Sequence, residues 1–539
     1  MAALGVAGYL YNNKNSAKEN NNASSVVADI SVNLSDLSSL KTYTKEDYET
    51  FLNDYKNSGL PNVYVTEFLF DGAGMYKTYD LDDFIEEGND VEVKTYTGTV
   101  INIKSSGTYE FTGELVGGMI AVNTNDVNGK INILLNGVKL DTDSKKVLVI
   151  HVYNKDINYT GAKVVINATQ NTKNYIEGGK LKKVSLIGSD ELSSYTSRYS
   201  GSNKTNYTAY TNYYGVYTKA DIDKVLFAKI TADNEDLQDG DPYYFYKAAG
   251  AISSDIDLYF EGEGYLEVTS KNKEGVETKG NLTFAGGIGD YVVNAQDDCL
   301  NTTTDGTNAR NTLTIDVNSL YAIVSLEADE GDAIDSNGEL IINGGTIVAL
   351  AKPGQDAGID SESGIYINGG TILATGDMYD EVKSDSKQNF MVLSFGTSTT
   401  ENDVITLLDQ NSNVVFSYKT DRTYANLVYS SSKLINGTYN MYKNGTINGS
   451  ENFGFYTNAT FAGGEQLGYN SNNIQGMGAG IPNSFNGENG NRTSKDRTEM
   501  QSMPGNMPNN MGGNTTASNK DFVISGISNL FSGVATYSE

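Results

Sequence analysis

The chain has 539 residues, and its 39 Lys and Arg residues against 68 Asp and Glu residues give a formal net charge of −29. This charge excludes electrostatic attraction to nucleic acid or to an anionic lipid surface as the default mode of binding. The composition, with 57 Gly, 37 Tyr, only 6 Pro and no Trp, predicts an all-β protein with many tight turns.

The first part of the chain predicts a leader followed by a helical region. Residues 1–35 indicate a leader or tether, because their apolar start is shorter than the ~20 residues that span a membrane and is followed by Asn, Ser and Ala. Within residues 36–90, apolar side chains at helical spacing follow a capping-box-like start at Thr44, and Gly59 and Pro61 end the segment. We expect this small helical cap to pack on one end of a β structure, and we expect no later membrane span.

Residues 91–388 alternate as strands do, and the middle of this region repeats itself. Ile252, Val276 and Leu300 follow one another at intervals of 24 residues, and Ile334 and Ile359 at an interval of 25. A repeat of this length with strand-like alternation predicts a right-handed parallel β-helix, in which these aliphatic residues stack in the interior. A small residue precedes each of them, and Cys299 is one of these small residues, so it needs no reactive role.

The last third of the chain predicts a second β structure with an interruption. Residues 389–470 indicate a C-terminal β-rich domain. Residues 471–520 are rich in Asn, Gly and Met and predict a flexible insertion without a core. Residues 521–539 become apolar again at Phe522, which indicates a strand that returns to the preceding domain, and a tail.

Two files of acidic and amide residues follow the repeat. With one Cys and one His a zinc site of the usual kind is excluded, and oxygen ligands for calcium or magnesium remain. Neighbouring strands lie ~4.8 Å apart, so stacked carboxylates repel by about 1 kcal/mol per pair in water unless a cation lies between them. We therefore predict a Ca²⁺ site, with a solvated acidic face as the alternative. One file is Glu277, Asn301, Asp335 and Asp360, and the other is Glu274, Asp298, Asp332 and Asp356. The predicted metal ligands are Asp297, Asp298, Asp332, Asp335, Asp356 and Asp360.

Residues 331–346 and 357–371, each with an Ile-Asp-Ser segment and a later Ile-Asn-Gly-Gly-Thr segment, resemble repeats of secreted bacterial carbohydrate-binding domain-containing proteins. The resemblance extends over about residues 90–460 and the final strand. It implies a parallel β-helix similar to family 9 polysaccharide lyases, bound calcium, and association with cellulose and pectic polysaccharides. The chain departs from the family at Cys299, where the usual corner has Gly, and in its N-terminal helical region.

The sequence is compatible with three functions. The first is a secreted or cell-surface calcium-binding protein that recognises plant cell-wall or other extracellular polysaccharide. Because the chain has no Trp, we predict that tyrosines of the Tyr-rich loop 193–217 stack on the sugar. The candidates are Tyr207, Tyr210, Tyr213 and Tyr214.

The second function is a structural or adhesive subunit of an extracellular filament or surface layer, which would self-assemble through open strand edges. The third is a calcium-dependent polysaccharide lyase with a Lys base. Lys279, Lys352 and Lys383 lie near the acidic files, but none has a diagnostic spacing, and we assign no catalytic residue.

Overall fold

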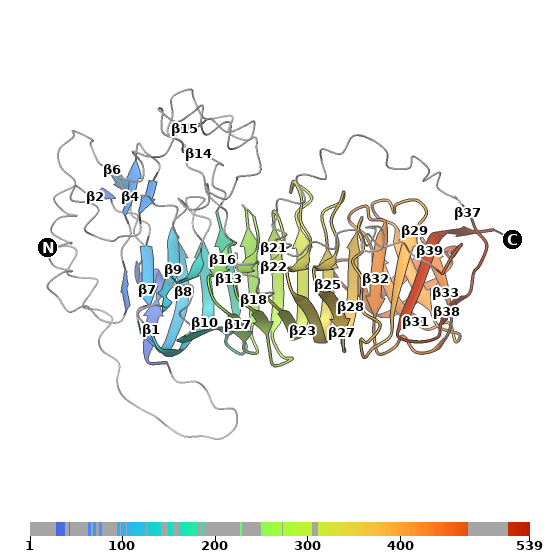
Figure 1. Ribbon diagram of the computed structural model, residues 1–539, viewed down its shortest axis with the longest axis horizontal. Helices are drawn as coiled ribbons and strands as arrows, with labels where there is room; N and C mark the ends of the chain where they lie inside the picture. The colour runs from blue at the N-terminus through green and yellow to red at the C-terminus, as the bar shows by residue number, and fades with distance from the viewer. Residues whose placement is uncertain are drawn as a thin grey trace, which may run out of the picture. The chain divides into compact units, whose positions relative to one another are not determined.

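The computed structural model of the protein describes residues 28–37, 42–43, 63–65, 68–71, 75–77, 94–96, 99–103, 105–124, 127–141, 149–154, 161–179, 185–186, 227–228, 250–271, 273–303, 311–472 and 516–538. The chain divides into an N-terminal unit, Met1–Leu258 with Val268–Lys273, and a C-terminal unit, Tyr259–Glu267 with Glu274–Glu539. The predicted helix, the Tyr-rich loop with its four candidate tyrosines, and all but the ends of the insertion lie outside the described residues. Figure 1 colours the strands in chain order.

The N-terminal unit is built mainly from strands that pair in parallel. One set is β1 (Ile30–Asn33), β8 (Gly107–Val116), β10 (Gly129–Asp141), β12 (Ala162–Ala168) and β13 (Lys173–Gly178). A second set is β7 (Thr99–Ile103), β9 (Gly118–Asn123), β11 (Ile150–Tyr153) and β16 (Ile252–Ser254), with β3 (Val63–Val65) antiparallel on β7. Short antiparallel pieces are β2 (Thr42–Tyr43), β4 (Phe68–Asp71), β5 (Met75–Lys77) and β6 (Lys94–Tyr96), and the pair β14 (Ser185–Leu186) and β15 (Phe227–Ala228). Ile120, Ile150 and Ile252 stand in register and are fully buried.

The C-terminal unit continues with parallel strands and ends with antiparallel ones. Residues at the unit boundary lie in β17 (Leu258–Glu261) and β18 (Tyr265–Ser270). The parallel strands are β20 (Leu282–Phe284), β21 (Asp290–Ala295), β23 (Leu313–Val324), β25 (Glu339–Leu350), β27 (Gly364–Ile367) and β28 (Thr371–Gly376), and the short strands β19 (Val276–Thr278), β22 (Leu300–Thr302), β24 (Ile334–Ser336) and β26 (Ile359–Ser361). The remaining strands are β29 (Phe390–Phe395), β30 (Val404–Leu408), β31 (Val414–Lys419), β32 (Asn426–Ser430), β33 (Gly437–Lys443), β34 (Thr446–Asn452), β35 (Phe455–Ala462), β36 (Glu465–Gly468), β37 (Thr516–Ala517), β38 (Phe522–Ile524) and β39 (Ser528–Tyr537).

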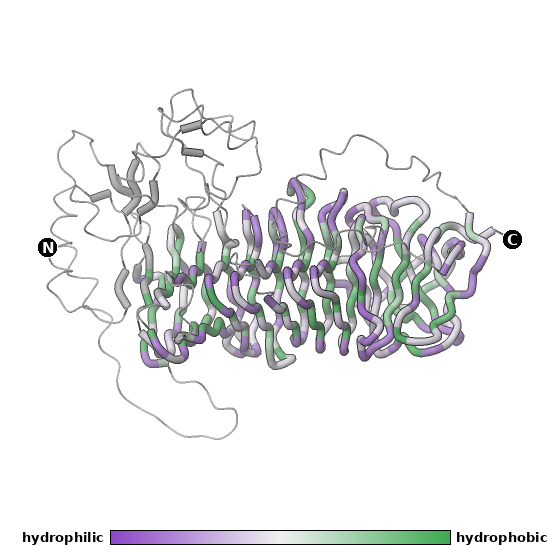
Figure 2. Tube along the Cα trace, in the orientation of Figure 1, coloured by the Kyte–Doolittle hydropathy of each residue, from purple (hydrophilic) through white to green (hydrophobic). Residues whose placement is uncertain are grey.

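In the C-terminal unit the register of the short strands follows the repeat. Leu300 pairs with Val276 on one side and with Ile334 on the other, and Ile334 pairs with Ile359. All four are buried, because the side-chain period of 2 turns the aliphatic residue inward and the next residue outward. Figure 2 shows the resulting alternation of apolar and polar residues along the strands.

The predicted fold class, a right-handed parallel β-helix with a small N-terminal helical cap, is wrong. The main network of strands closes as a barrel with additional strands, and the helical element that the described residues form, Leu34–Leu37, is a short 3-10 turn. No helix in this part of the chain is long and apolar enough to cross a membrane.

The spacing of the repeat does not predict that the strand network closes as a barrel. Spacing determines which residues lie side by side on adjacent strands, but it does not determine where each strand ends. β25 runs through the bulge at Gly344, so it pairs with both β27 and β28, and two arms of one repeat become one continuous sheet. β39 then joins the network to the antiparallel strands, because it pairs in parallel with β29 and antiparallel with β36. β38, the returning strand, pairs with β33.

One large apolar cluster joins the parallel and antiparallel parts of the C-terminal unit. Outward residues of the parallel strands, such as Tyr321, Val348 and Leu373, are buried together with Phe416 and Tyr429 of the antiparallel strands. The antiparallel strands cover this face and so remove its side chains from water. Burial of each large apolar side chain contributes roughly 1.5–3 kcal/mol to the stability of the fold.

Cys299 is expected to be unreactive in the native protein. The thiol is fully buried, and burial, followed by the charge of Asp298, raises its pKa far above the ordinary value. Because the thiolate is the reactive form, we expect labelling by a disulfide reagent at pH 8 to be on the order of a hundredfold or more slower in native protein than in concentrated urea. As this is the chain's single Cys, total thiol release measures it directly, and fast labelling of native protein would contradict the expectation.

Candidate metal centre

The short strands β19, β22, β24 and β26 carry the acidic file on their outward positions. Glu277 pairs with Asn301, Asn301 with Asp335, and Asp335 with Asp360. Each outward residue lies between a buried aliphatic residue and a buried hydroxyl residue. Backbone pairing in register therefore stacks the four polar side chains on neighbouring strands.

The buried hydroxyl groups on the inward side hold these short strands in place. The hydroxyls of Thr302 and Ser336 share a hydrogen bond of 3.1 Å. Ser361 Oγ donates to the backbone oxygen of Gly338 at 2.6 Å. Three-residue strands have few backbone bonds of their own, so these contacts keep the outward carboxylates at fixed positions.

The second file, at the corners before these strands, uses its carboxylates partly for the backbone. Asp298 Oδ1 accepts a hydrogen bond from the amide of Asp332 at 2.8 Å. Asp332 Oδ1 in turn accepts one from the amide of Ala357 at 2.6 Å. Each corner aspartate thus links one repeat to the next through one oxygen.

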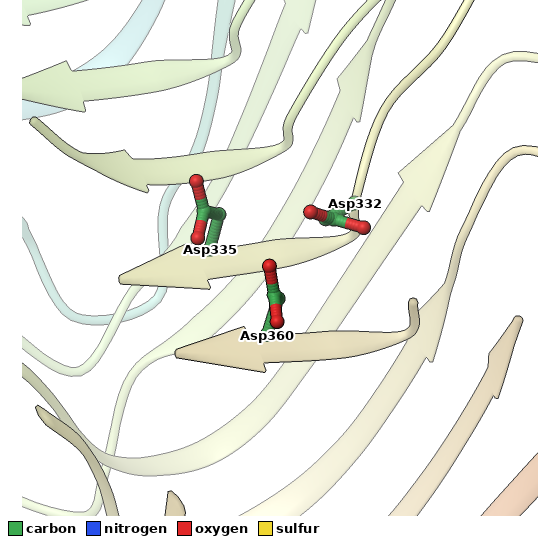
Figure 3. Close-up of side chains that lie close together, drawn as sticks. All are labelled: Asp332, Asp335 and Asp360. Carbon is green, nitrogen blue, oxygen red and sulfur yellow. The ribbon is translucent and has the colours of Figure 1, made fainter. Parts of the chain in front are cut away.

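Three carboxylates from the two files converge. Asp332, Asp335 and Asp360 each place a carboxylate oxygen within 4.8 Å of the others (Figure 3). Asp332 is 1% exposed, whereas Asp335 and Asp360 are half-buried. A partly exposed triad of this kind is open to an ion from solvent on one side and backed by protein on the other.

Asn301 adds an amide to this triad. Its Nδ2 donates to Asp298 Oδ2 and, at 3.4 Å, to Asp335 Oδ2. The side chain is 7% exposed, and its Oδ1 accepts no hydrogen bond from any described residue. A buried amide oxygen without a donor costs roughly 1–3 kcal/mol unless something else, such as a cation or a water molecule, satisfies it.

The electrostatics of the cluster favour a cation. Burial raises the pKa of the Asp298 carboxyl well above its ordinary value, and the charges of Asp335, Asp297, Asp332 and Glu274 raise it further, in that order. All of these causes act in the same direction. A positive ion among the carboxylates would lower the pKa of Asp298 instead, because a nearby opposite charge favours the ionised form.

The structure brings together three of the six predicted metal ligands, Asp332, Asp335 and Asp360. Asp298 adjoins them through the Asn301 amide and through its backbone bond to Asp332. Asp297 is half-buried and acts on Asp298 through its charge.

Asp356 is buried and lies outside the triad. Ala357, the next residue in the chain, stands at the corner instead, and its amide donates to Asp332 Oδ1 as the amide of Asp332 donates to Asp298 Oδ1. One extra residue before Ile359 causes this difference, since Asp332 stands two residues before its aliphatic partner and Asp356 stands three before.

Sequence reasoning left two neighbours out of the predicted ligand set. Asn301 belongs to the outer file that the sequence predicts, but it is not among the six predicted ligands. Asp380 accepts a hydrogen bond from the amide of Ser361 at 3.1 Å, and the charge of Asp360 contributes to raising the pKa of Asp380. No repeat signal marks Asp380, although the bridge between Ile365 and Val382 continues the parallel stacking there.

The donor set fits calcium. Calcium takes 6–8 oxygen ligands at about 2.4 Å, and carboxylate and amide oxygens are its usual protein ligands. Asp332, Asp335 and Asp360 would supply three carboxylates, and Asn301 Oδ1, which no described residue donates to, would supply a further oxygen. This set leaves coordination positions for water or for the hydroxyls of a ligand.

Without a divalent ion, the protein is expected to become less stable as pH rises from about 5 to 7.5. Burial, then the charge of Asp360, raises the pKa of Asp380 to about 6. The folded state therefore holds this proton more tightly than the unfolded chain, and the stabilisation is complete below the unfolded pKa near 3.9 and is lost as pH passes about 6.

The measurement is urea unfolding in the presence of chelator at several pH values. The wild type should lose on the order of 1–2 kcal/mol more than Asp380→Asn over this pH range, because the variant lacks the titrating group. Parallel pH profiles for the two proteins would contradict the expectation.

Two of the three candidate lyase bases, Lys352 and Lys383, hydrogen-bond to groups outside the acidic files. Lys352 Nζ donates to the backbone oxygen of Leu326 at 3.0 Å, and Lys383 Nζ donates to Glu381 at 2.6 Å. The hydrogen bond to Glu381 raises the pKa of Lys383, which favours the protonated form over the free base. No observation at these lysines favours lyase chemistry.

Comparison with protein families gives one match. The model of a family described as carbohydrate-binding domain-containing protein matches residues 97–194 and 216–406, which together are more than half of the chain. These ranges include the strands that carry the carboxylate triad. The comparisons with curated proteins and with solved structures found no match.

Proposed function

From the premise that this chain belongs to the family of carbohydrate-binding domain-containing proteins, we propose that it is a secreted or cell-surface protein that binds extracellular polysaccharide with the help of calcium. Family membership supports the carbohydrate-binding role. The net charge of −29 is consistent with a glycan partner and disfavours a polyanion bound without a bridging cation. Plant cell-wall polysaccharide is the glycan class that we propose first.

The triad of Asp332, Asp335 and Asp360 is the observation that carries the calcium part of the proposal. One oxygen of each carboxylate lies within 4.8 Å of the other two on strands held by backbone pairing, and Asn301 Oδ1 beside them accepts no hydrogen bond from the described residues. Stacking these carboxylates without a cation costs about 1 kcal/mol per pair in water, and more where burial lowers the dielectric constant.

The affinity expected of such a site supports the proposed location. Calcium sites of extracellular modules commonly have Kd values of about 0.1–1 mM, which suits an environment where calcium is always present. A partly exposed site that offers three carboxylates, with water at its remaining positions, would belong to this weaker class. Secretion can be tested separately, by fractionation of the producing cells and detection with an antibody.

Glycan binding is tested by pull-down with insoluble plant polysaccharides and by affinity electrophoresis with soluble ones, each in calcium and in chelator. We expect retention on at least one polysaccharide, and weaker retention in chelator. Asp335→Asn with Asp360→Asn should behave in calcium as the wild type does in chelator. Absence of binding to every polysaccharide would refute the glycan part, and binding indifferent to chelator would refute the calcium part.

A further inference from the structure

An aromatic ring is exposed at the turn between β34 and β35, in the C-terminal unit. Phe453 is 43% exposed, and its ring lies 4.8 Å from that of Tyr321, centroid to centroid, at a tilt of 40°. Tyr321 itself is 9% exposed. The two rings thus form a surface with one buried and one open aromatic face.

The backbone at Phe453 is unusual for such a side chain. Asn452 pairs with Phe455, so Phe453 and Gly454 form a two-residue turn, and both have positive φ values, 46° and 78°. Turns of this kind prefer Asn followed by Gly, and a bulky residue in this conformation is an outlier. Backbone strain of roughly 1–3 kcal/mol tends to occur at sites where it serves binding, and here it presents a Phe ring to solvent.

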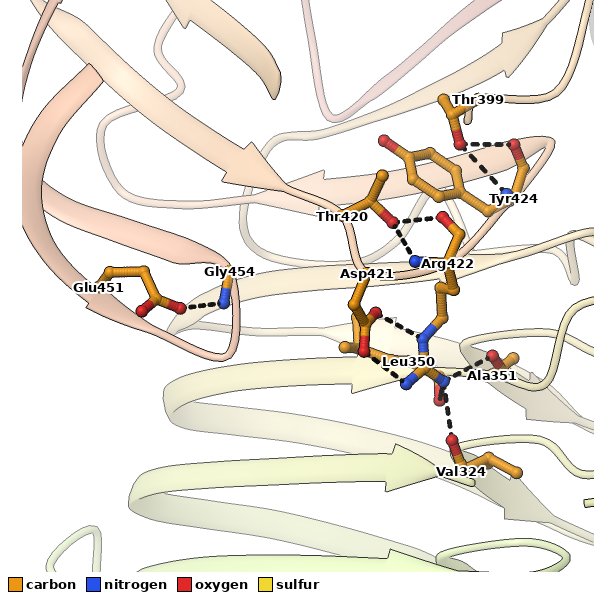
Figure 4. A network of polar contacts seen from close by, with 10 residues as sticks. All are labelled: Val324, Leu350, Ala351, Thr399, Thr420, Asp421, Arg422, Tyr424, Glu451 and Gly454. Atoms are coloured by element: carbon orange, nitrogen blue, oxygen red, sulfur yellow. Dashed lines mark hydrogen bonds and ion pairs between the residues drawn. The ribbon is translucent and has the colours of Figure 1, made fainter. Parts of the chain in front are cut away.

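Two hydrogen bonds of the Gly454 backbone hold the turn in place. The amide of Gly454 donates to the carboxylate of Glu451 (Figure 4). The carbonyl of Gly454 accepts from the amide of Lys419 at 2.8 Å. These bonds fix the backbone that carries Phe453, and its ring contacts that of Tyr321, so less freedom is lost when a ligand binds.

Hydrogen-bonding groups surround the rings. Asn452 Nδ2 donates to the Tyr321 hydroxyl at 3.2 Å. Val292 pairs with Tyr321 and Asp290 with Ser319, so the period of 2 places Asp290 on the same face as Tyr321. The pKa of Tyr321 is raised first by burial and also by the charge of Asp290, and the bond from Asn452 opposes this rise.

One carboxylate oxygen of Asp290 is available to accept hydrogen bonds from a ligand. Its Oδ1 accepts from Asn318 Nδ2 at 2.7 Å and from Ser319 Oγ at 2.6 Å. Its Oδ2 accepts no hydrogen bond from any residue in the described ranges. A half-buried carboxylate with one free oxygen, fixed by two donors, suits a ligand that offers hydroxyl groups.

We propose that Phe453, Tyr321, Asn452 and Asp290 form a subsite for one uncharged sugar ring of a neutral polysaccharide. The apolar face of a pyranose ring would stack on Phe453, and two of its hydroxyls would donate to Asp290. A uronate is disfavoured, because its carboxylate would face Asp290 on a chain of net charge −29. This proposal rests on the proposed function and deepens it, since it names the class of glycan and a place where it binds.

The test uses the full chain and titration calorimetry with cellohexaose, mannohexaose and hexagalacturonate, in calcium. Phe453→Asn removes the ring and installs the residue that the turn prefers, so the variant should fold and melt at or above the wild-type temperature. Ile435→Asn removes an apolar side chain that is 65% exposed and is the matched control. Asp290→Ala tests the polar half of the subsite.

We expect the wild type to bind at least one neutral hexasaccharide, Phe453→Asn to bind it about tenfold or more weakly, and Ile435→Asn to bind it as the wild type does. Asp290→Ala should also weaken binding, because it removes the acceptor. Equal affinity of Phe453→Asn and the wild type for the neutral sugar would overturn the subsite and leave the proposed function standing. If the wild type bound hexagalacturonate but neither neutral hexasaccharide, the subsite would likewise be overturned and the proposed function would stand. Failure of the wild type to bind any glycan would overturn both.

Discussion

Calcium added to chelator-treated protein is expected to raise the melting temperature by several degrees. An ion that binds only the folded state stabilises it by RT ln(1 + [L]/Kd), which is about 2.7 kcal/mol at a hundredfold excess over Kd. Asp332, Asp335 and Asp360 each place one carboxylate oxygen within 4.8 Å of the others, so the ion would also offset their mutual repulsion. Thermal unfolding followed by circular dichroism, in chelator and in increasing calcium, measures the shift.

The double variant Asp335→Asn with Asp360→Asn should lose most of this response. In chelator it should melt no lower than the wild type, because two of the repelling charges are gone while the shape of the side chains is kept. Asp329→Asn with Glu330→Gln makes the same change in charge at two exposed positions and should keep the calcium response. A wild-type melting temperature that is indifferent to calcium would leave only a solvated acidic face.

Replacing Arg422 is expected to destabilise the C-terminal unit by about 3–5 kcal/mol. The residue is 3% exposed, and its Nη1 donates to the backbone oxygens of Val324, Leu350 and Ala351 at 2.8, 3.2 and 3.0 Å (Figure 4). Nε and Nη2 bind the two oxygens of Asp421. One guanidinium thus ties the loop between β31 and β32 to the ends of β23 and β25.

Arg422→Ala leaves these three carbonyls without their donor, and each such buried group costs roughly 1–3 kcal/mol. Arg422→Lys should recover only part of the loss, because an ammonium group lacks the planar fork that reaches the carbonyls and the carboxylate together. Asp421→Ala should cost about 1 kcal/mol or less, since the side chain of Asp421 is 58% exposed. Urea unfolding compares the variants, with the exposed Lys419→Ala as control. Equal stability of Arg422→Ala and Lys419→Ala would contradict the expectation.

The arrangement of the short strands was determined by the sequence alone. An interior position must be apolar and the next position outward can be polar, so equal spacing of aliphatic residues sets equal spacing of their outward neighbours. That rule placed Asp335 beside Asp360 and Asn301 beside Asp335. It also explained Cys299 as a small buried corner residue.

Only the tertiary structure decided how the strands close and which side chains outside the repeat meet. Closure as a barrel depends on where β23 and β25 bend and on the pairing of β39. The spacing of aliphatic residues in the repeat gives no information on either feature. Arg422 reaches carbonyls 71 to 98 residues away along the chain, and Asn452 reaches Tyr321 131 residues away. These contacts link segments that share no period, so they follow from the packing of one strand set against another and not from any local pattern. The exclusion of Asp356, by contrast, can be read from the sequence, because one inserted residue places Ala357, which has no carboxylate, at the position that Asp332 has in its own repeat.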